Sequence, residues 1–235
     1  MVKVPKYYRV KNEILALTAE LTPGSALPTE RELAERFGTS RTTVRQAIAE
    51  LVVDGRLTRT QGSGTFVAQP KLMQVRPLTS FSQDLTSEGR RPGSVLLDLR
   101  EEPADGEVRE RLRLPPGAPV VRLERLRTVA DEPIAHEIAH VPGPLPEFAE
   151  RLAELGSLYR TMREAYDMGV TSVEDTVETA LADPVTADIL GVATGLPLLL
   201  IHRSGWDGAG RPVEWTTSRF RGDRFRFVSR QQLEP

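Results

Sequence analysis

Apolar side chains in the first part of the chain recur at the spacing of amphipathic helices. Between Tyr7 and Leu21 they follow one another at alternating steps of three and four residues, which predicts one helix. The stretch from Thr29 to Arg45 predicts two shorter helices joined by a tight turn. The inner face of the second of these helices is formed at i, i+3, i+4 and i+7 by Val44, Ala47, Ile48 and Leu51.

Local signals predict where these two helices begin and end. Thr29 and Glu32 have the three-residue spacing of a capping box at the start of the first helix. Gly38 suits the left-handed conformation that often ends a helix, and Ser40 is expected to cap the next one. The predicted unit is therefore a helix, a turn and a second helix.

The same spacing leaves polar side chains on the open side of the second helix. They are Arg41, Thr42, Thr43, Arg45 and Gln46. Guanidiniums and hydroxyls at a helix start suit the phosphates and the base edges of a DNA major groove. A helical hairpin inside a larger bundle, with its charges merely solvated, gives the same pattern. The stretch therefore favours DNA binding and leaves the bundle open.

Two short β-prone runs follow, at 57–60 and 65–67, joined by Gln61-Gly62-Ser63-Gly64. We expect a hairpin whose tip, free of bulky side chains, approaches a DNA backbone or enters a minor groove. A hairpin that only closes the small core fits the same residues. The two interpretations are compatible, because Phe66 and Val67 need burial whereas the tip glycines do not.

After residue 77 the pattern changes to strands paired by short turns. The expected strands are 120–129, 134–141, 198–206, 213–220 and 225–229, and helices are expected near 145–155, 157–166 and 184–190. Strands paired through short loops, with helices apart from them, indicate an α+β fold on an antiparallel sheet. Residues 71–77, KLMQVRP, break the periodicity and end in proline. We therefore expect a domain at 1–70, a linker at 71–77 and a second domain at 78–235.

Composition narrows the class of protein. The chain has 235 residues and no cysteine, which excludes disulfides and thiolate metal sites. No apolar run approaches the roughly 20 residues that span a bilayer, and the N-terminus lacks the apolar core of a signal peptide. We therefore expect a cytoplasmic protein with no membrane partner.

The net charge of −2 divides unevenly along the chain. Residues 1–70 hold ten Lys and Arg against seven Asp and Glu, a net of +3. The remainder holds 21 against 26, a net of −5. A basic first part on an acidic second part suits a DNA-binding module attached to a separate domain.

Two arginines share the apolar face of the predicted strand 120–129. The odd positions of this strand read Val121, Leu123, Arg125, Arg127 and Val129. A charge directed into a core is costly unless it is paired, so both arginines are expected to meet an anion. That anion is either a bound ligand or an internal carboxylate, for which the candidates are Glu124, Glu137 and Glu214. Alternatively, strand twist or a bulge turns both arginines to solvent.

Ser80-Phe81-Ser82 precedes a predicted helix at 83–88. Free N–H groups and a hydroxyl at a helix start can seat a phosphate, and simple N-capping gives the same pattern.

Catalysis finds little support in the sequence. His136 and His140 lie on one face of a predicted strand about 13 Å apart, which is too far to share one metal ion. No G-x-S-x-G, H-E-x-x-H or P-loop pattern occurs. We expect no enzyme activity, no catalytic residue, no bound metal and no cofactor.

Two motifs in the first domain, PGSALPTERELAERFGTSRTTVRQAI and DGRLTRTQGSGTFVA, carry a family resemblance. Through most of residues 6–68, without a gap, they resemble the winged helix-turn-helix of the GntR superfamily of bacterial regulators. The resemblance implies a DNA contact from Arg31, which the residue pattern alone does not indicate. It also implies contacts from the start of the recognition helix and from the wing tip, at Ser40, Arg41, Thr42, Thr43, Arg45, Gln61 and Gly62.

The motifs LTSFSQDL, RLERLR, EPIAHE, SLY, VEDTVETALA and RPVEWTTSRFRGDRF cover nearly all of residues 75–228. They are similar to the UTRA effector domain of the HutC subfamily, which shares the chorismate-lyase fold. With the PKYYR start, they look closest to amino-sugar-phosphate regulators of the NagR and DasR type. The resemblance implies that a phosphate is held by Phe81, Ser82, Arg125, Arg127, Ser157 and Tyr159. It also implies that Glu137 and Glu214 grip the sugar, and Phe220 stands where those relatives usually have tyrosine.

Together the resemblances imply a ligand-responsive bacterial transcription regulator, a repressor, that binds palindromic double-stranded operator DNA. A single winged helix reads only a few base pairs, so useful specificity needs two half-sites. We therefore expect a homodimer. We expect the second domain to hold it, because the apolar residues of the first domain are used up by its own small core. The implied effector is an amino-sugar phosphate such as glucosamine 6-phosphate or N-acetylglucosamine 6-phosphate. Another phosphosugar or a carboxylate metabolite is the alternative.

Overall fold

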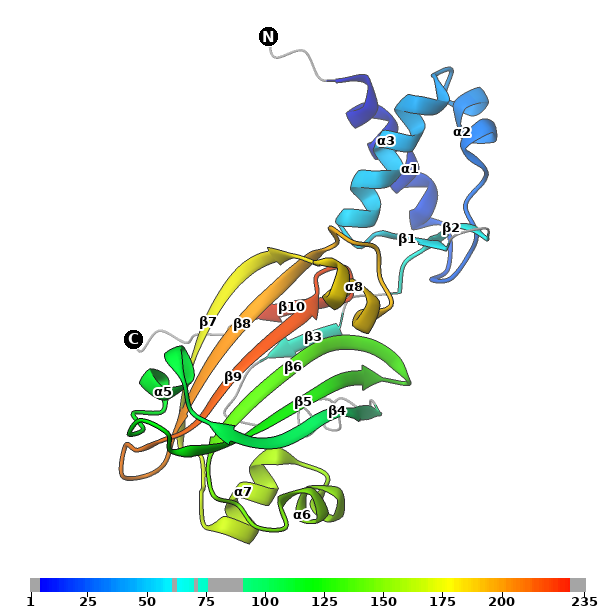
Figure 1. Cartoon of the computed structure of the whole chain (residues 1–235). Coiled ribbons are helices and arrows are strands. Elements are labelled where there is room, and N and C mark those ends of the chain that lie inside the picture. The colour runs from blue at the N-terminus through cyan, green and yellow to red at the C-terminus, as the bar shows by residue number, and fades with distance from the viewer. Residues whose placement is uncertain (1–4, 61–62, 70–71, 76–90, 229–235) are drawn as a thin grey trace, which may run out of the picture. The chain divides into compact units, whose positions relative to one another are not determined.

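The computed structural model describes residues 5–60, 63–69, 72–75 and 91–228. The chain divides into two compact units (Figure 1). The first holds Met1–Leu72 with Gly222–Arg224, and the second holds Met73–Arg221 with Phe225–Pro235. Among the described residues, no helix is long and apolar enough to cross a lipid bilayer.

The first unit consists of three helices and a two-stranded hairpin. Its elements are α1 (Lys6–Ala19), α2 (Glu30–Arg36), α3 (Arg41–Val53), β1 (Leu57–Thr60) and β2 (Gly64–Val67). The predicted helix signals are confirmed. Thr29 and Glu32 form a capping box, the Ser40 Oγ accepts the N–H of Thr43 at 3.2 Å, and Gly38 has a φ of 56°. These residues form a winged helix-turn-helix, as predicted.

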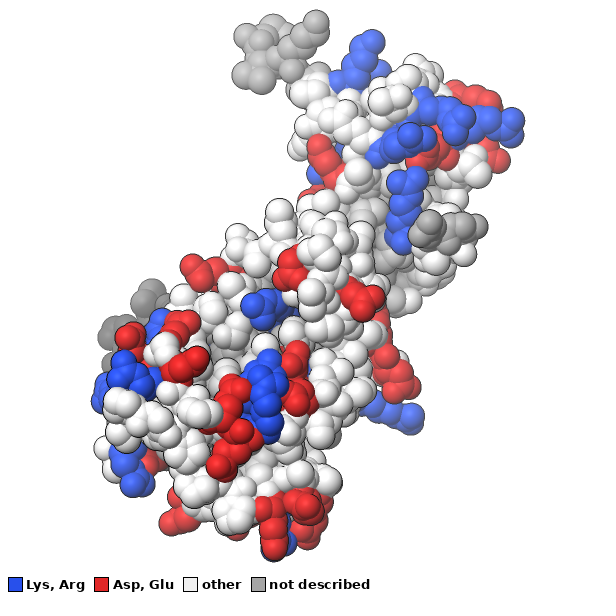
Figure 2. Space-filling model, viewed as in Figure 1, with Lys and Arg blue, Asp and Glu red and all other residues white. Residues whose placement is uncertain are grey.

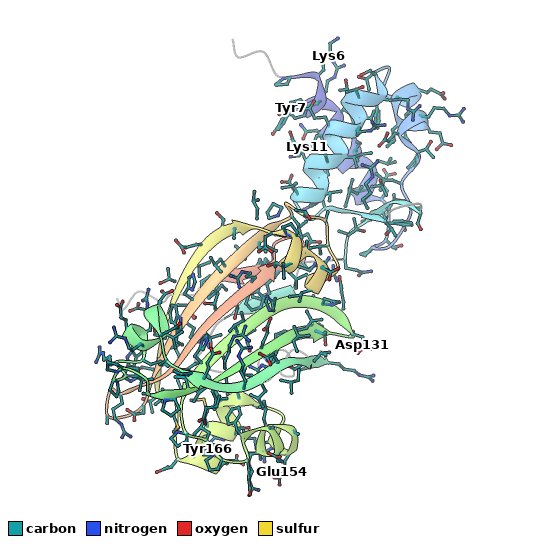
Figure 3. The ribbon with its side chains drawn as sticks, in the orientation of Figure 1. Lys6, Tyr7, Lys11, Asp131, Glu154 and Tyr166 are labelled. Atoms are coloured by element: carbon teal, nitrogen blue, oxygen red, sulfur yellow. The ribbon has the colours of Figure 1, made fainter. Side chains whose placement is uncertain are left out.

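The core of the first unit is built on the predicted inner face of α3. The four residues of this face are each at most 1% exposed, and Ile14 of α1 and Leu33 of α2 pack with them. Lys11 of α1, labelled in Figure 3, adds ion pairs to Glu50 at 3.1 Å and to Asp54 at 2.7 Å, near the C-terminal end of α3. Apolar burial thus fixes the three helices, and the polar side chains at the start of α3 are not part of this core.

The second unit is built on a six-stranded antiparallel sheet of order β4-β5-β6-β9-β8-β7. The strands are β4 (Pro92–Pro103), β5 (Pro119–Val129), β6 (Glu132–Pro142), β7 (Ser172–Leu181), β8 (Pro197–Trp206) and β9 (Pro212–Arg221). The helices are α5 (Gly106–Arg111), α6 (Phe148–Leu155), α7 (Leu158–Tyr166) and α8 (Pro184–Leu190). A separate two-stranded sheet pairs β3 (Leu72–Val75) with β10 (Phe225–Val228).

Helices cover both faces of the large sheet (Figure 1). α6 and α7 pack through Phe148 and Met162 on the face that carries Leu123 of β5. On the opposite face α5 packs near Val120, and α8 packs near Leu126. The side of β5 that carries Arg125 and Arg127 is therefore the side of α6 and α7.

Every strand and helix predicted after residue 77 and described here is present, so the α+β prediction is confirmed. Sequence patterning did not predict β4, α5 or β7. Within the predicted linker at 71–77, residues 72–75 form strand β3. The boundaries at 1–70, 71–77 and 78–235 stay predictions, and the predicted helix at 83–88 lies outside the described residues.

Candidate DNA-binding and effector sites

The predicted DNA-contact residues of the recognition helix α3 share its first turns. Arg41, Thr42 and Arg45 are exposed, whereas Thr43 is half-buried and its Oγ1 lies 2.8 Å from the Oγ of Ser40. The side chain of Ser40 caps the helix by accepting one backbone N–H. The other N–H groups of the first turn have no partner within the helix, and the hydroxyls and guanidiniums lie around them. This arrangement can hold a phosphate and present side chains to base edges.

Arg31 lies in the first turn of α2 and is exposed. Figure 2 shows basic side chains gathered on the visible face of this unit, with acidic side chains among them. The wing-tip residues Gln61 and Gly62 lie outside the described residues, so their DNA contacts stay a prediction.

Two residues near the recognition helix were missed by sequence reasoning. Glu30 of α2 forms ion pairs with Arg45 at 2.9 Å and with Arg59 of β1 at 2.7 Å. No periodic pattern connects these residues, which are up to 29 positions apart. Only the packing of α2 against α3 and β1 reveals them.

Arg125 and Arg127 are buried, at 6% and 4% exposed, so the alternative that turned them to solvent is wrong. Arg125 forms an ion pair with Glu137 on the neighbouring strand β6, and Arg127 donates to the Oγ of Ser94 at 3.3 Å. The Nε of Arg125 is buried and has no hydrogen-bond partner in the described part of the chain. The internal ion pair therefore exists, and it leaves a donor unused.

Strand register brings further polar residues to the same face. Arg125 lies opposite Glu137, and Glu137 lies opposite Ser218 of β9. On the next two strands Arg203 of β8 lies opposite Asp175 of β7 and is bound to it by two hydrogen bonds of 2.8 Å. A polar cluster therefore crosses the middle of an otherwise apolar sheet face.

Tyr159 of α7, the helix that packs on this face of the sheet, also belongs to the cluster. Its hydroxyl donates to Glu214 of β9 at 2.6 Å and accepts from Arg203 at 3.3 Å. Glu214 is 3% exposed and also accepts from the hydroxyl of Thr216 at 2.6 Å. The predicted residues Arg125, Glu137, Tyr159 and Glu214 thus belong to one face, together with Arg203.

The charges of the cluster act on one another. Burial opposes ionisation of Glu137, but the charges of Arg125 and Arg127 outweigh it and lower its pKa to about 2. Burial, with the charge of Arg125, lowers the pKa of Arg127 to about 10. Both groups are charged at neutral pH. Burial raises the pKa of Glu214, so this carboxyl accepts a proton more readily than an ordinary glutamate.

The remaining predicted effector residues have mixed positions. Ser157 caps α7 and is half-buried. Phe220 is 2% exposed, and its ring stacks on that of Phe225 with centroids 4.2 Å apart. Phe81 and Ser82 lie outside the described residues. The structure holds no test of a ligand contact, so the effector roles of these four residues and of the other predicted residues stay predictions.

Arg203 and Asp175 were not predicted as site residues. The signal for Arg203 was present, because the face that carries Leu199 and Ile201 continues to Arg203, just as the apolar face of β5 continues to Arg125. Asp175 lies in β7, a strand whose alternation is hidden by polar residues on both faces.

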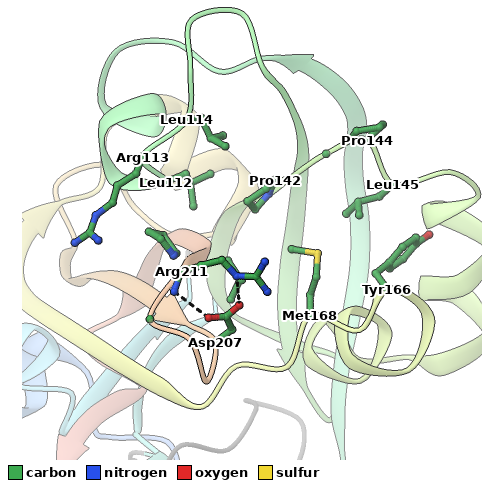
Figure 4. A pocket seen from close by; sticks show the side chains of 14 residues that line it. Leu112, Arg113, Leu114, Pro142, Pro144, Leu145, Tyr166, Met168, Asp207 and Arg211 are labelled. Atoms are coloured by element: carbon green, nitrogen blue, oxygen red, sulfur yellow. Dashed lines mark hydrogen bonds and ion pairs between the residues drawn. The ribbon is translucent and has the colours of Figure 1, made fainter.

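A cavity of about 660 Å³ lies elsewhere in the second unit (Figure 4). Its walls are mainly apolar, and an ion pair between Arg211 and Asp207 at 2.7 Å borders it. It is lined by Leu112, Arg113, Leu114, Pro142, Gly143, Pro144, Leu145, Tyr166, Met168, Asp207, Gly210, Arg211, Pro212 and Val213. None of the predicted effector residues belongs to this lining.

The opposite face of the sheet holds a different set of charges. Glu124 accepts from Arg122 at 2.8 Å and lies 2.6 Å from the Nε2 of His136. Glu124 is therefore not the partner of Arg125 or Arg127. Among the described residues, no group of three or more His, Asp or Glu side chains is placed to hold a metal ion.

Comparison with known families gives two matches. Residues 7–67 match the family of bacterial regulatory proteins named gntR, and residues 87–226 match the UTRA domain. The chain is 36% identical to the HTH-type transcriptional repressor NagR of Bacillus subtilis, over 96% of this chain and 94% of that protein. It is 30% identical to the mannosyl-D-glycerate transport/metabolism system repressor MngR of Escherichia coli, over 95% of each chain.

A solved structure agrees with these matches. The crystal structure of PhnF from Mycobacterium smegmatis is 32% identical, covers 96% of this chain and 100% of its own, and has a TM-score of 0.64. PhnF is an HTH-type transcriptional repressor. These similar proteins are transcription regulators rather than enzymes, and their similarity spans both units.

Proposed function

The chain belongs to the gntR family of bacterial regulatory proteins and carries a UTRA domain, and on this premise we propose a ligand-responsive repressor. The first unit binds palindromic operator DNA, and the second unit binds a small anionic effector. The recognition helix α3 enters the major groove with Arg41 and Arg45 as its principal contacts. Arg31 and the wing tip at Gln61 and Gly62 contact the backbone or the minor groove.

The effector is an amino-sugar phosphate, such as glucosamine 6-phosphate or N-acetylglucosamine 6-phosphate. One observation supports this most directly: Arg125 and Arg127 are buried side by side on one sheet face, and the Nε of Arg125 has no hydrogen-bond partner among the described residues. Buried guanidiniums bind phosphate and carboxylate through charge-assisted hydrogen bonds. We therefore assign the phosphate to the two arginines, and the family resemblance adds Phe81, Ser82 and Ser157 to its contacts.

The rest of the sugar extends along the polar cluster. Glu137 is ionised and can accept from hydroxyl or ammonium groups, whereas Glu214, with its raised pKa, is already hydrogen-bonded to Tyr159 and Thr216. An amino sugar supplies hydroxyl and ammonium groups, and these can donate hydrogen bonds to the carboxylate of Glu137. Phe220, buried beside this face, offers an apolar surface in place of a hydroxyl.

A second effector class is a carboxylate metabolite. A specific observation favours it: MngR, at 30% identity, is named for mannosyl-D-glycerate, a sugar derivative that ends in a carboxylate. Arg125 and Arg127 suit a carboxylate as well as a phosphate, because both anions accept paired N–H bonds from guanidinium. The anion site is common to both classes, and only the ligand differs.

A thermal-shift titration of the full chain tests the effector site. The probes are glucosamine 6-phosphate, N-acetylglucosamine 6-phosphate, mannosyl-D-glycerate and unphosphorylated glucosamine. We expect the melting temperature to rise with an amino-sugar phosphate and to stay constant with glucosamine. Arg125→Ala should lose this rise, whereas Arg122→Ala should keep it, because Arg122 is on the same strand but on the opposite face.

The outcomes separate the parts of the proposal. A rise with mannosyl-D-glycerate alone, lost in Arg125→Ala, retains the anion site and replaces the amino-sugar phosphate by a carboxylate. An undiminished response in Arg125→Ala places the effector away from β5 and contradicts the site.

A further inference from the structure

Glu30, the first residue of α2, joins the recognition helix to the first strand of the wing. Arg45 of α3 donates to Glu30 from Nε at 3.1 Å and from Nη2 at 2.9 Å. Arg59 of β1 donates from Nη2 to the other carboxylate oxygen at 2.7 Å. One carboxylate therefore sets the spacing of two guanidiniums that come from different elements.

Within this group the glutamate side chain is more deeply buried than the two arginine side chains. The side chain of Glu30 is 14% exposed, against 58% for Arg45 and 51% for Arg59. Hydrogen bonds from Arg45, followed by the charges of both arginines, lower the pKa of Glu30, so it is ionised at neutral pH. More than half of each arginine side chain remains accessible to another molecule.

Helix capping does not account for this arrangement. Acidic residues are common in the first turn of a helix because they interact with its N–H groups. In α2 that role belongs to Glu32, which accepts the N–H of Thr29 at 2.8 Å. The Glu30 carboxylate is turned instead toward α3 and β1.

We propose that Glu30 determines DNA specificity by holding Arg45 and Arg59 in one arrangement, and that Arg59 is a further contact to the DNA backbone. The proposal rests on the DNA-contact role of Arg45 proposed above. Non-specific affinity comes from Lys and Arg neutralising phosphates, and specificity is a difference between two affinities. The carboxylate of Glu30 neutralises one positive charge of this surface. It also repels DNA phosphates whose positions differ from those that the two fixed guanidiniums can contact. DNA that matches the pair keeps its contacts.

The test uses the full chain and two duplexes. One is selected by the wild-type protein from a random-sequence library, and the other has the same length and composition in shuffled order. The specificity ratio is the dissociation constant of the shuffled duplex divided by that of the selected one. Both constants are measured over a series of salt concentrations.

Glu30→Gln is expected to tighten binding of the shuffled duplex, to weaken binding of the selected duplex, and so to lower the ratio by about tenfold or more. The slope of log K against log salt on the shuffled duplex should steepen by about one for each DNA-binding unit, because a guanidinium is freed for phosphate. A variant that is merely less stable would bind both duplexes more weakly and would not steepen the salt slope.

Glu35→Gln is the matched control, because Glu35 is an exposed acid on the same helix. It should shift both affinities together and keep the ratio within about twofold of the wild type. An equal ratio in the Glu30 and Glu35 variants overturns the role of Glu30.

Arg59→Gln changes the wing residue of the same ion-paired group. It tests the proposal even if Glu30→Gln fails to fold. It should weaken binding to both duplexes and reduce the salt slope by about one for each DNA-binding unit. An unchanged slope removes Arg59 from the DNA contacts and overturns the proposal. Arg45→Ala separates this outcome from failure of the proposed function, since wild-type affinity in that variant means that α3 does not contact DNA.

Discussion

At the level of single residues, the buried pair of Arg125 and Glu137 makes stability depend on pH. The pKa of Glu137 is lowered from 4.5 to about 2 in the folded chain. Its stabilising contribution is therefore present at neutral pH and is lost as the pH falls from about 4.5 to about 2. Glu137→Gln should be less stable than wild type by about 3–5 kcal/mol at pH 7, because Arg125 is left buried without its partner.

The difference between the two proteins should shrink as the pH falls, since protonated Glu137 resembles glutamine. Urea unfolding at several pH values from 7 to about 3 measures it. Glu154→Gln, a change at a largely exposed acid of α6, is the control and should show no such convergence. A constant difference between Glu137→Gln and wild type across this range contradicts the lowered pKa.

Gly205 of β8 gives Glu214 the room that it needs. A Cβ at this position would lie 3.1 Å from the Oε2 of Glu214 and 3.3 Å from the Cγ1 of Val170. Gly205→Ala should therefore displace the Glu214 carboxylate, cost about 1–3 kcal/mol of stability, and weaken effector binding. Thermal unfolding and effector titration measure the two effects.

Gly208→Ala in the same hairpin is the control, since its nearest contact would be an ordinary 3.9 Å. Equal behaviour of the two alanine variants contradicts a packing role for Gly205.

At the residue scale, sequence alternation predicted part of the polar cluster on the sheet face. Arg125 and Arg127 were found because they interrupt an apolar strand face, and a charge on such a face needs a partner. The same reasoning, applied to β8, would have found Arg203. It could not choose between a ligand and Glu137 as the partner of Arg125, because the partner depends on the register between β5 and β6.

At the level of elements, the start of α3 depends on one side chain. The Oγ of Ser40 accepts the N–H of Thr43 at 3.2 Å, which satisfies a donor that the helix itself leaves free. Ser40→Ala should destabilise the first unit by about 1 kcal/mol, whereas Ser40→Gly should cost only a few tenths, because glycine is tolerated at this position. Circular dichroism melting of the full chain compares the two variants, and equal melting temperatures contradict the capping role.

The two strands missed by sequence reasoning, β4 and β7, lack the alternation on which a strand prediction depends. In β4 a register shift between Leu96 and Asp98 interrupts the alternation on which a strand prediction depends. β7 is the other edge of the sheet and exposes both of its faces in part, so its residues follow no apolar pattern. The interior strands β5, β6, β8 and β9 were predicted because burial on one face enforces alternation. In the first unit the helices were predicted because one small core requires helical spacing.

At the level of the whole molecule, assembly is expected to involve the second unit. The apolar face of α3 is used up inside the first unit, whereas Leu96 of β4 and Leu181 of β7 are 53% and 69% exposed. Light scattering should give twice the chain mass of 26.0 kDa. The double variant Leu96→Asp and Leu181→Asp should dissociate the dimer, because charges at an apolar interface are costly to bury.

Val53→Asp changes an exposed apolar residue of the first unit, 51% exposed, and should leave the dimer intact. Dissociation by Val53→Asp alone would move the interface to the first unit.

Recognition of DNA is expected to need the start of α3 more than any other surface. Arg41→Ala and Arg45→Ala should each lose about 1–3 kcal/mol of operator binding free energy for each DNA-binding unit, and twice that in a dimer. Both side chains are exposed, so melting temperature and effector response should stay near wild type. Gel-shift titration at fixed salt measures the loss. Wild-type affinity in both variants contradicts the assignment of α3 as the recognition helix.

Effector control requires that effector binding to the second unit change the free energy of DNA binding by the first unit. A ligand changes DNA affinity only if it binds differently to the DNA-competent arrangement and to another one, and such couplings are typically about 1–3 kcal/mol. We expect glucosamine 6-phosphate or N-acetylglucosamine 6-phosphate to shift operator affinity by about 5- to 150-fold in the wild type. Arg125→Ala leaves Glu137 without its partner, so its operator affinity is measured at a temperature where the variant is fully folded. There it should bind the operator as the wild type does, because the first unit is unchanged, and it should show no shift, because the anion site is lost.

Arg122→Ala should keep the shift, since Arg122 is paired with Asp98 and Glu124 on the opposite face of the same strand. Operator titrations with and without effector, at one salt concentration, compare the three proteins. A wild-type shift in Arg125→Ala means that the controlling anion binds elsewhere. A shift lost in both variants means that the fold of the sheet, rather than the anion site, carries the coupling.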